Sequence, residues 1–488
     1  MASRTKPNII VIKTDEQRFD TLGCMGNPVI RTPNIDRLAQ EGFVFDNAFC
    51  VAPLCVPSRV SFFTGQYVHR THCTDNATEH HIAPGQWSFV ESLVHNGYAA
   101  GLAGKNHAFQ DAYFEQWFCC REEYDHWGKV AGEITAADAE VRAWRTGQQR
   151  TDSSLPDGML MEGLIDKPEP FPEKQCPPLR IAEDACGFID AQYGGPFFLH
   201  ISFPEPHWPN VVCEPYFSMI DPDGIELDGL EVDWKTRPYA HFVQSQSSGF
   251  DQYGLRERRR ILATYYGQIM AVDTAIGVVL GHLEKRGVRD ETIIVFTSDH
   301  GDLAGRFGLI SKTKAFYEPI LRIPLILSLP GMGSGGRIHA QVSNIDVIPT
   351  LAEFLGIQAP DRVQGSSFLP VLRGKTDKHR EEIFAEIGQP ERPPEPIPYE
   401  EYPAYNQRRC ETDGVFWFIE YTTLGRAAMV RRDGWKYCFY VGDGEELYCL
   451  NDDPLELHNL AGTPEAAQIQ EKMRRRLMEW LLTEPVRD

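Results

Sequence analysis

Buried strands dominate the hydrophobic pattern of this chain. Residues 8–14 form an almost continuous apolar run with several β-branched side chains, and similar runs recur at residues 196–203, 292–297 and 323–329. Such runs are typical of strands that are covered on both faces, as in a parallel sheet. Long stretches with helical patterns separate them. The alternation predicts an α/β fold with a large, mostly parallel sheet flanked by helices.

The strongest helical pattern covers residues 260–286, where apolar side chains recur mostly every three or four positions. Gly287 follows the last periodic residue, and glycine at this position is a common helix stop. The helix leads into the predicted strand at residues 292–297, so we expect helix and strand to form one crossover unit of the sheet.

The composition of the chain changes after residue 374. Residues 389–405 are rich in proline, glutamate and tyrosine, which predicts an extended loop. Two strand patterns follow within residues 427–440, and Asp433-Gly434 between them is a strong hairpin signal. A last helix is expected from about residue 464 to 482. These features predict a large α/β domain over residues 1–374 and a smaller C-terminal α+β subdomain over residues 375–488.

The bulk composition excludes several classes of protein. Of the 488 residues, 42% are hydrophobic and 24% are charged, and no apolar run is long enough to span a membrane. The net charge of -21 argues against nucleic acid as a partner, because phosphate backbones are bound mainly through Lys and Arg. The apolar stretch that begins at Ile9 is too short for a signal-peptide core. We therefore expect a cytoplasmic protein with no membrane partner.

Candidate chemistry begins with the segment Cys55-Val-Pro-Ser-Arg59, which Thr64-Gly65 follows. Proline suits the first turn of a helix and glycine suits its end, so Cys55 is expected at a helix N-terminus, which attracts anions. A buried cysteine before a short structural helix would give the same local pattern.

Carboxylates follow two of the predicted strands. Asp15 and Glu16 come directly after the first strand, and Asp299 and His300 come after the strand at residues 292–297. Because the carboxyl ends of parallel strands face the ligand crevice, these side chains should lie together and offer oxygen and imidazole ligands to a divalent cation.

The Cys-x-Pro-Ser-Arg segment with its Thr-Gly stop resembles the signature of the sulfatase family, which belongs to the alkaline phosphatase superfamily. The resemblance implies that a formylglycine-generating enzyme oxidises Cys55 to formylglycine. One hydroxyl of the hydrated aldehyde would attack sulfur, and the other would later expel sulfate. It also implies that Asp15, Glu16, Asp299 and His300 hold the metal. Glu16 and His300 differ from the residues of many relatives, and Ca²⁺ and Mn²⁺ both stay open.

Three further motifs carry the same resemblance. They are Gly97-Tyr-x₅-Gly104-Lys105-x-His107, the proline-flanked His207, and Gly308-Leu-x-x-Lys312. By resemblance, Lys105 binds a sulfate oxygen, His107 orients or deprotonates the nucleophile, His207 binds the ester and can protonate the leaving oxygen, and Lys312 contacts the bridging or a peripheral oxygen. Together with Arg59, the two lysines would supply positive charge inside the pocket of an acidic protein.

The sequence thus predicts hydrolysis of sulfate monoesters, with carbohydrate or aryl sulfates as the substrates that the family implies. One alternative is a phosphonate monoester or phosphodiester hydrolase on the same scaffold, since related sites bind both tetrahedral anions. Another is a catalytically silent binding protein, in which Cys55 would remain a thiol. A homo-oligomer stays open.

Overall fold

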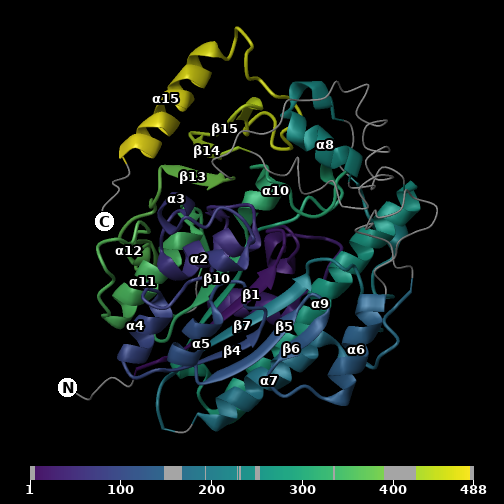
Figure 1. Cartoon of the computed structure of the whole chain (residues 1–488), viewed down its shortest axis with the longest axis vertical. Helices are drawn as coiled ribbons and strands as arrows, with labels where there is room; N and C mark the ends of the chain where they lie inside the picture. Colours follow the sequence, from purple (N-terminus) through teal and green to yellow (C-terminus); the bar gives the residue numbers. More distant parts are fainter. Residues whose placement is uncertain are drawn as a thin grey trace.

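The computed structural model describes residues 6–147, 167–192, 194–227, 229, 232–247, 253–333, 336–388 and 425–483. The loop predicted at residues 389–405 lies outside these ranges. Figure 1 shows one α/β body with the C-terminal elements at its upper end. None of the described helices is both long enough and apolar enough to cross a membrane.

A nine-stranded sheet forms the centre of the molecule. Its middle strand is β1 (Asn8–Asp15), which pairs in parallel with β7 (Phe197–Pro206) and with β8 (Thr292–Ser298). All residues of these three strands are buried, as the continuous apolar runs predict. The sheet has the order β11-β2-β10-β8-β1-β7-β4-β5-β6. Its further strands are β4 (Ala99–Gly104), β5 (Cys120–Asp125), β6 (Gly128–Ala131), β10 (Leu325–Ser328), β2 (Phe43–Phe45) and β11 (Arg337–Ile338).

The fourth predicted strand differs from the expectation. Pro324 divides residues 323–329 into β9 (Arg322–Ile323) and β10 (Leu325–Ser328), since proline has no N–H for a sheet ladder. β10 runs antiparallel to β8, and β9 joins a three-stranded sheet with β3 (Ala48–Phe49) and β12 (Val342–Ser343). The parallel centre of the sheet is confirmed, but its β10 side is antiparallel.

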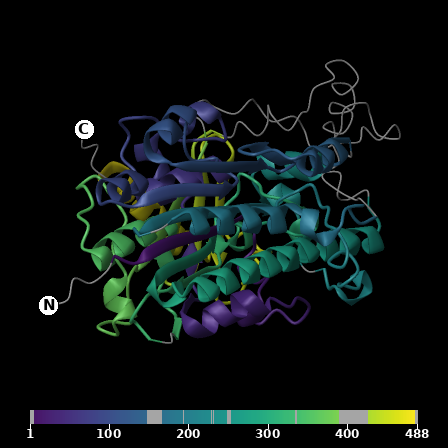
Figure 2. The ribbon, with the colours of Figure 1, turned by 90° about the horizontal axis from the view of Figure 1, so that it is seen from below.

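Helices cover both faces of the sheet. On one face, α1 (Pro33–Glu41), α7 (Pro177–Ala191) and α9 (Leu255–Arg286) enclose one apolar core, and α2 (Cys55–Thr64), α4 (Phe89–His95) and α11 (Val347–Leu355) enclose another on the opposite face. Figure 2 shows the long α9 running beneath the strands. Further helices among the described residues are α3 (Val68–Thr71), α5 (Asp111–Trp117), α6 (Ala136–Gly147), α8 (Tyr239–Ser247), α10 (Glu318–Leu321) and α12 (Leu369–Leu372).

The predicted stop of the long helix is confirmed. α9 ends at Arg286, and Gly287 has a φ of 70°, so glycine accommodates the left-handed conformation of the C-cap without a Cβ penalty. The helix begins at Leu255, five residues before the predicted start.

A separate, four-stranded antiparallel sheet closes the C-terminal end. It consists of β13 (Glu382–Ile387), β14 (Ala427–Arg432), β15 (Trp435–Tyr440) and β16 (Gly444–Cys449), and α15 (Ala467–Thr483) packs on it. The predicted hairpin is confirmed at Asp433-Gly434, where both residues have positive φ. The predicted domain boundary after residue 374 stays a prediction.

Candidate active site

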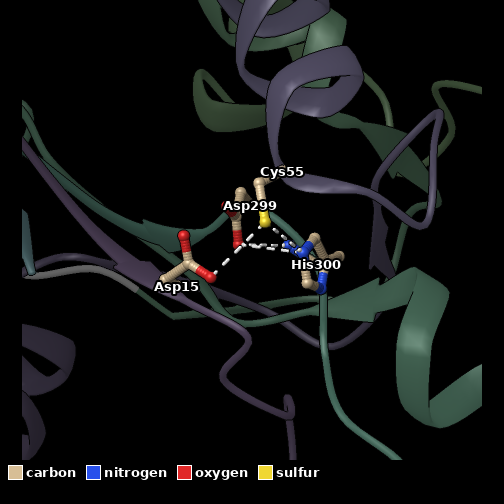
Figure 3. A group of neighbouring side chains, drawn as sticks. All are labelled: Asp15, Cys55, Asp299 and His300. Carbon is tan, nitrogen blue, oxygen red and sulfur yellow. Dashed lines mark hydrogen bonds and ion pairs between the residues drawn. The ribbon is translucent and has the colours of Figure 1, made fainter. Parts of the chain in front are cut away.

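The candidate site lies where the carboxyl ends of β1 and β8 meet the N-terminus of α2. Asp15 is the last residue of β1, and Asp299 and His300 follow β8 directly. Because Thr14 and Ser298 are partners in the parallel ladder, the two strands end at the same level of the sheet. Cys55 is the first residue of α2 and points between these side chains (Figure 3).

Cys55 is buried at the centre of this group. Its Sγ lies 3.3 Å from Nε2 of His300 and donates to Oδ1 of Asp15 at 3.6 Å. Burial, together with the negative charge of Asp15, raises the pKa of the Cys55 thiol to about 12. A thiol with this pKa is protonated at neutral pH, and the thiol form is a weak nucleophile. As an unmodified thiol, Cys55 is therefore poorly suited to attack an ester.

Arg59 lies one turn of α2 beyond Cys55 and links the two strand ends. Its Nε donates to Oδ2 of Asp299 at 2.8 Å, and its Nη2 donates to Oδ2 of Asp15 at 2.9 Å. Its Nη1 donates to the hydroxyl of Ser202 in β7 at 2.8 Å. Arg59, Asp15 and Asp299 all have side chains with no solvent exposure. The guanidinium therefore compensates two carboxylates that burial alone would disfavour.

The donor set at this point fits a divalent cation. Ligand atoms of Asp15, Cys55, Asp299 and His300 all lie within 4.8 Å of one another. Nδ1 of His300 is 2.8 Å from the carbonyl oxygen of Gly301, so Nδ1 carries the proton and Nε2 presents its lone pair to the group. Metal-bound histidines commonly have this arrangement, in which a backbone carbonyl fixes the tautomer.

The carboxylate of Glu16 has partners of its own. Its Oε1 accepts from the hydroxyl of Ser311 at 2.7 Å and from the backbone N–H of Lys312 at 2.6 Å, and its Oε2 lies 3.3 Å from Nζ of Lys312. Burial raises the pKa of Glu16 to about 7, although the charge of Lys312 opposes the shift. Glu16 forms a second group of potential ligands with Asp15 and His207. Its carboxylate thus lies on the Lys312 side of Asp15.

Lys105 approaches Asp15 from β4. Its Nζ donates to Oδ2 of Asp15 at 2.5 Å, and its backbone N–H donates to the carbonyl oxygen of Ser202 at 2.7 Å. Gly104, just before it, has a φ of 112°, and a Cβ there would lie 1.9 Å from the same carbonyl oxygen. Only glycine permits this close approach of β4 to β7. Burial opposes ionisation of Asp15, but the charges of Lys105 and Arg59 outweigh it and hold the pKa of Asp15 well below its usual value.

His207 and Lys312 form a pair on the Glu16 side of the site. Nδ1 of His207 lies 2.7 Å from the carbonyl oxygen of Trp208, so Nδ1 is the donor and Nε2 is an acceptor. Nζ of Lys312 lies 2.7 Å from this Nε2. Burial and the charge of Lys312 lower the pKa of His207 well below its usual value. The imidazole is thus neutral and accepts a hydrogen bond from the ammonium.

The structure brings most of the predicted site residues into direct contact. Contacts of 4.0 Å or less join Asp15, Glu16, Cys55, Arg59, Lys105, His207, Asp299, His300 and Lys312. His107 is less closely linked. Its ring lies 6.1 Å from that of His126, and its buried Nδ1 has no hydrogen-bond partner among the described residues.

Sequence reasoning missed two residues at this site. Asn76 accepts the backbone N–H of Val56 at 3.1 Å and so satisfies one free donor at the start of α2. His126 follows β5, and its ring stacks on that of His207 with 3.8 Å between the centroids. The position of His126 at the carboxyl end of a strand is the signal that could have identified it. Asn76 lies in a loop and has no such position after a strand, so the sequence gives no signal for it.

The chain is similar to known proteins in sequence and in fold. The family model described as Sulfatase matches residues 7–357. An N-acetylglucosamine-6-O-sulfatase of Bacteroides thetaiotaomicron is 27% identical, over 97% of this chain and 86% of the relative. A multifunctional alkaline phosphatase superfamily protein of Trinickia caryophylli is also 27% identical, over 98% of this chain and 96% of its own. A crystal structure of a phosphonate monoester hydrolase of Agrobacterium radiobacter has a similar fold, with a TM-score of 0.76 and 22% identity over 97% of this chain and 95% of the other.

The chain belongs to the sulfatase family, because the family model covers well over half of it. Its fold is that of the alkaline phosphatase superfamily, and its class is that of a sulfatase-type hydrolase. These three predictions from the sequence are confirmed.

Proposed function

We propose that this protein hydrolyses sulfate monoesters with a formylglycine nucleophile derived from Cys55. The observation that carries the proposal is the position of Cys55, whose Sγ is buried between Asp15 and His300 at the N-terminus of α2. A helix N-terminus favours an anion at this point. The thiol itself is protonated at neutral pH and is therefore a weak nucleophile, so we assign the attack to a hydrated aldehyde at the same Cβ, as the resemblance to the sulfatase family implies.

The residues around Cys55 suggest a catalytic role for each side chain of the site. Asp15, Glu16, Asp299 and His300 would hold a divalent cation, Ca²⁺ or Mn²⁺. When bound, the cation supplies positive charge beside the nucleophile and the sulfate oxygens. Arg59 holds the carboxylates of Asp15 and Asp299 in place through its hydrogen bonds. His107 is proposed to orient or deprotonate the formylglycine hydrate, with its neutral imidazole as the acceptor.

Lys105 contacts Asp15, Lys312 contacts Glu16, and both lysines would contact sulfate oxygens. Both ammonium groups are buried or nearly so, with exposed side-chain fractions of 1% and 13%. Charge-assisted hydrogen bonds in such an environment stabilise charge on the departing oxygen more strongly than they would in water. The positive field that an anionic substrate requires is therefore local, despite the net charge of -21.

The pair of His207 and Lys312 suggests a path for the proton that the leaving alcohol needs. Nε2 of His207 already accepts from Nζ of Lys312, while Nδ1 is held by the carbonyl of Trp208. A proton that moves from Lys312 or solvent to Nε2 would be aimed at the oxygen that leaves. The hydrolysis of esters of weakly acidic alcohols should depend on this pair most, because these alcohols need a proton in order to leave.

A phosphonate monoester or phosphodiester hydrolase is the second candidate. The ligand His300 supports it, since a nitrogen ligand favours metals other than Ca²⁺ and related sites bind both sulfuryl and phosphoryl anions. Substrates of the two classes that share one aryl leaving group separate the candidates. We expect the protein to hydrolyse the aryl sulfate with higher kcat/KM than the aryl phosphonate or the diaryl phosphate. The opposite order would establish the second candidate.

Cysteine variants provide the control for this assay. Cys55→Ala should lose all turnover, because neither a thiol nor an aldehyde can form there. Cys186→Ala makes the same change on α7, where Cys186 is half-buried and outside the site, and should keep full activity. Equal turnover by wild type and Cys55→Ala would overturn the proposal. A protein that binds the esters without turnover would indicate a silent binding protein.

The natural alcohol is proposed from relatives alone. Named relatives include the N-acetylglucosamine-6-O-sulfatase, an arylsulfatase of Clostridium perfringens and an ulvan-active sulfatase of Formosa agariphila. On this basis we propose a saccharide or aryl sulfate as substrate and a formylglycine-generating enzyme as partner. The predicted cytoplasmic location and a homo-oligomeric state stay predictions.

A further inference from the structure

His126 lies in direct contact with two of the proposed ester-binding groups. Its Nε2 lies 2.9 Å from Nζ of Lys105. Its ring stacks on that of His207, with centroids 3.8 Å apart and planes inclined by 22°. No other described residue joins these two groups by a hydrogen bond on one side and a stacked ring on the other.

The hydrogen bond to Lys105 has a defined direction. An ammonium group only donates, so Nε2 of His126 must be the acceptor, and the ring proton must sit on Nδ1. Lys105 therefore donates to Oδ2 of Asp15 on one side and to His126 on the other. Two acceptors at fixed positions leave the third N–H of the ammonium with a set direction. Without His126, the ammonium would be held by Asp15 alone and could swing about that single contact.

The turn that carries His126 is itself fixed to the strand that carries His207. Nη1 of Arg145 in α6 donates to the carbonyl oxygen of His126 at 3.3 Å and to Oε1 of Glu205 at 3.1 Å. Glu205 lies in β7, two residues before His207. Arg145 is buried, and its Nε donates to Glu169 at 2.6 Å. Trp127 also packs edge-on against Trp208, at 5.6 Å between ring centroids. The β5–β6 turn and the end of β7 are thus held together at several points.

We propose that His126 is a positioning residue, which directs the ammonium of Lys105 through its Nε2 and holds the ring of His207 by stacking. This inference rests on the proposed function, because it assumes that Lys105 and His207 contact the ester. Arg145 acts one step further away, by fixing the backbone of His126 relative to β7.

Two substitutions separate the two contacts. His126→Phe keeps a flat ring on His207 but removes the acceptor for Lys105. His126→Gln keeps an acceptor oxygen near the position of Nε2 but removes the ring. His95→Phe, at an exposed histidine of α4, is the matched control and should behave as wild type. The formylglycine content of each preparation, measured by mass spectrometry, normalises the rates.

The two variants should differ in their dependence on the leaving group. His126→Phe should lower kcat/KM by about 10- to 100-fold, the effect of losing a hydrogen bond to a charged group, and should do so equally for nitrophenyl and alkyl sulfates. For His126→Gln, kcat/KM with the nitrophenyl sulfate should stay within about threefold of the wild-type value. The decrease in kcat/KM with the alkyl sulfate should be at least about tenfold larger, because only the alkyl ester needs the proton from His207. If the role of His126 were merely structural, kcat/KM would fall by the same factor for both esters in both variants.

A double-mutant cycle with Lys105→Met tests whether His126 acts through Lys105. If it does, His126→Phe should have no further effect in the Lys105→Met background. Losses that multiply independently would overturn the positioning role. Lys105→Met with wild-type turnover would overturn the proposed function and this inference together.

Binding of inorganic sulfate, measured by calorimetry, decides the question without turnover. His126→Phe should weaken sulfate binding about tenfold or more, and His126→Gln should weaken it less than threefold. Unchanged sulfate affinity in His126→Phe would overturn the positioning role even if the protein proved to be a sulfatase.

Discussion

Replacing Arg59 with methionine should destabilise the metal-free protein strongly. The guanidinium donates to Asp15, Asp299 and Ser202, and the two carboxylates it contacts have no solvent exposure. Methionine is long enough to fill much of the space but cannot pair with either carboxylate. Removal of one partner of a buried ion pair typically costs about 3–5 kcal/mol, because an uncompensated charge remains.

The expected change in melting temperature follows from the size of the protein. An unfolding entropy of about 2.1 cal/mol/K per residue, taken over 488 residues, gives about 1 kcal/mol per degree. Arg59→Met should therefore lower the Tm by about 3–5 °C in a buffer with a chelator. Added Ca²⁺ or Mn²⁺ should reduce the difference in Tm between Arg59→Met and wild type, because a cation bound by Asp15 and Asp299 would compensate the negative charges of these two carboxylates.

Thermal unfolding followed by circular dichroism is the assay, and Arg373→Met is the control. Arg373 pairs with Glu353 at the surface, where both side chains are more than 40% exposed, so its loss should cost less than about 1 kcal/mol. If Arg59→Met melts within 1 °C of wild type in the chelator, the guanidinium does not compensate these carboxylates. A difference that metal fails to narrow would refute the shared role of Asp15 and Asp299.

Three further predictions concern the metal, the β4–β7 contact and the C-terminal sheet. Because burial raises the pKa of Glu16 to about 7, Glu16 holds a proton below that pH and must release it to a bound cation. Affinity for Mn²⁺, measured by calorimetry, should thus rise about tenfold per pH unit up to pH 7 and then level off, and Glu16→Gln should remove this rise. Gly104→Ala should lower the free energy of unfolding by at least ~2 kcal/mol in chemical denaturation, because the added Cβ would clash with the carbonyl oxygen of Ser202. A variant with wild-type stability would contradict this close approach of β4 to β7. Lys436→Met should lower the free energy of unfolding by about 3–5 kcal/mol in the same assay, because Lys436 forms an ion pair with the buried Glu456. A decrease below ~1 kcal/mol would show that this ion pair contributes little to stability.

The sequence was sufficient for the parallel centre of the fold and for the residues at its strand ends. Strands β1, β7 and β8 are buried on both faces, so their apolar runs are continuous and easily recognised. The carboxylates after them lie together because parallel neighbours end at one edge of the sheet. The direction of β10 was not predictable in this way, since an apolar run carries no information on whether a strand is parallel or antiparallel.

Tertiary contacts explain what the sequence left out. His126 gains its place at the site only when the β5–β6 turn packs against the end of β7, and no local pattern encodes that stacking. Lys13 is a second example. It lies inside the apolar run of β1, fully buried, with its Nζ 3.6 Å from the ring centroid of Phe62. Burial and the charge of Arg59 lower its pKa well below the usual value, which favours the neutral amine at this buried position.

We propose that Cys55 becomes the nucleophile only after conversion to formylglycine. The most direct measurement is mass spectrometry of the peptide that contains Cys55, from protein made with an active formylglycine-generating system, alongside sulfate release by the same sample. We expect an aldehyde at position 55 and sulfate release in proportion to the aldehyde content. An intact thiol in a sample with full turnover would contradict it.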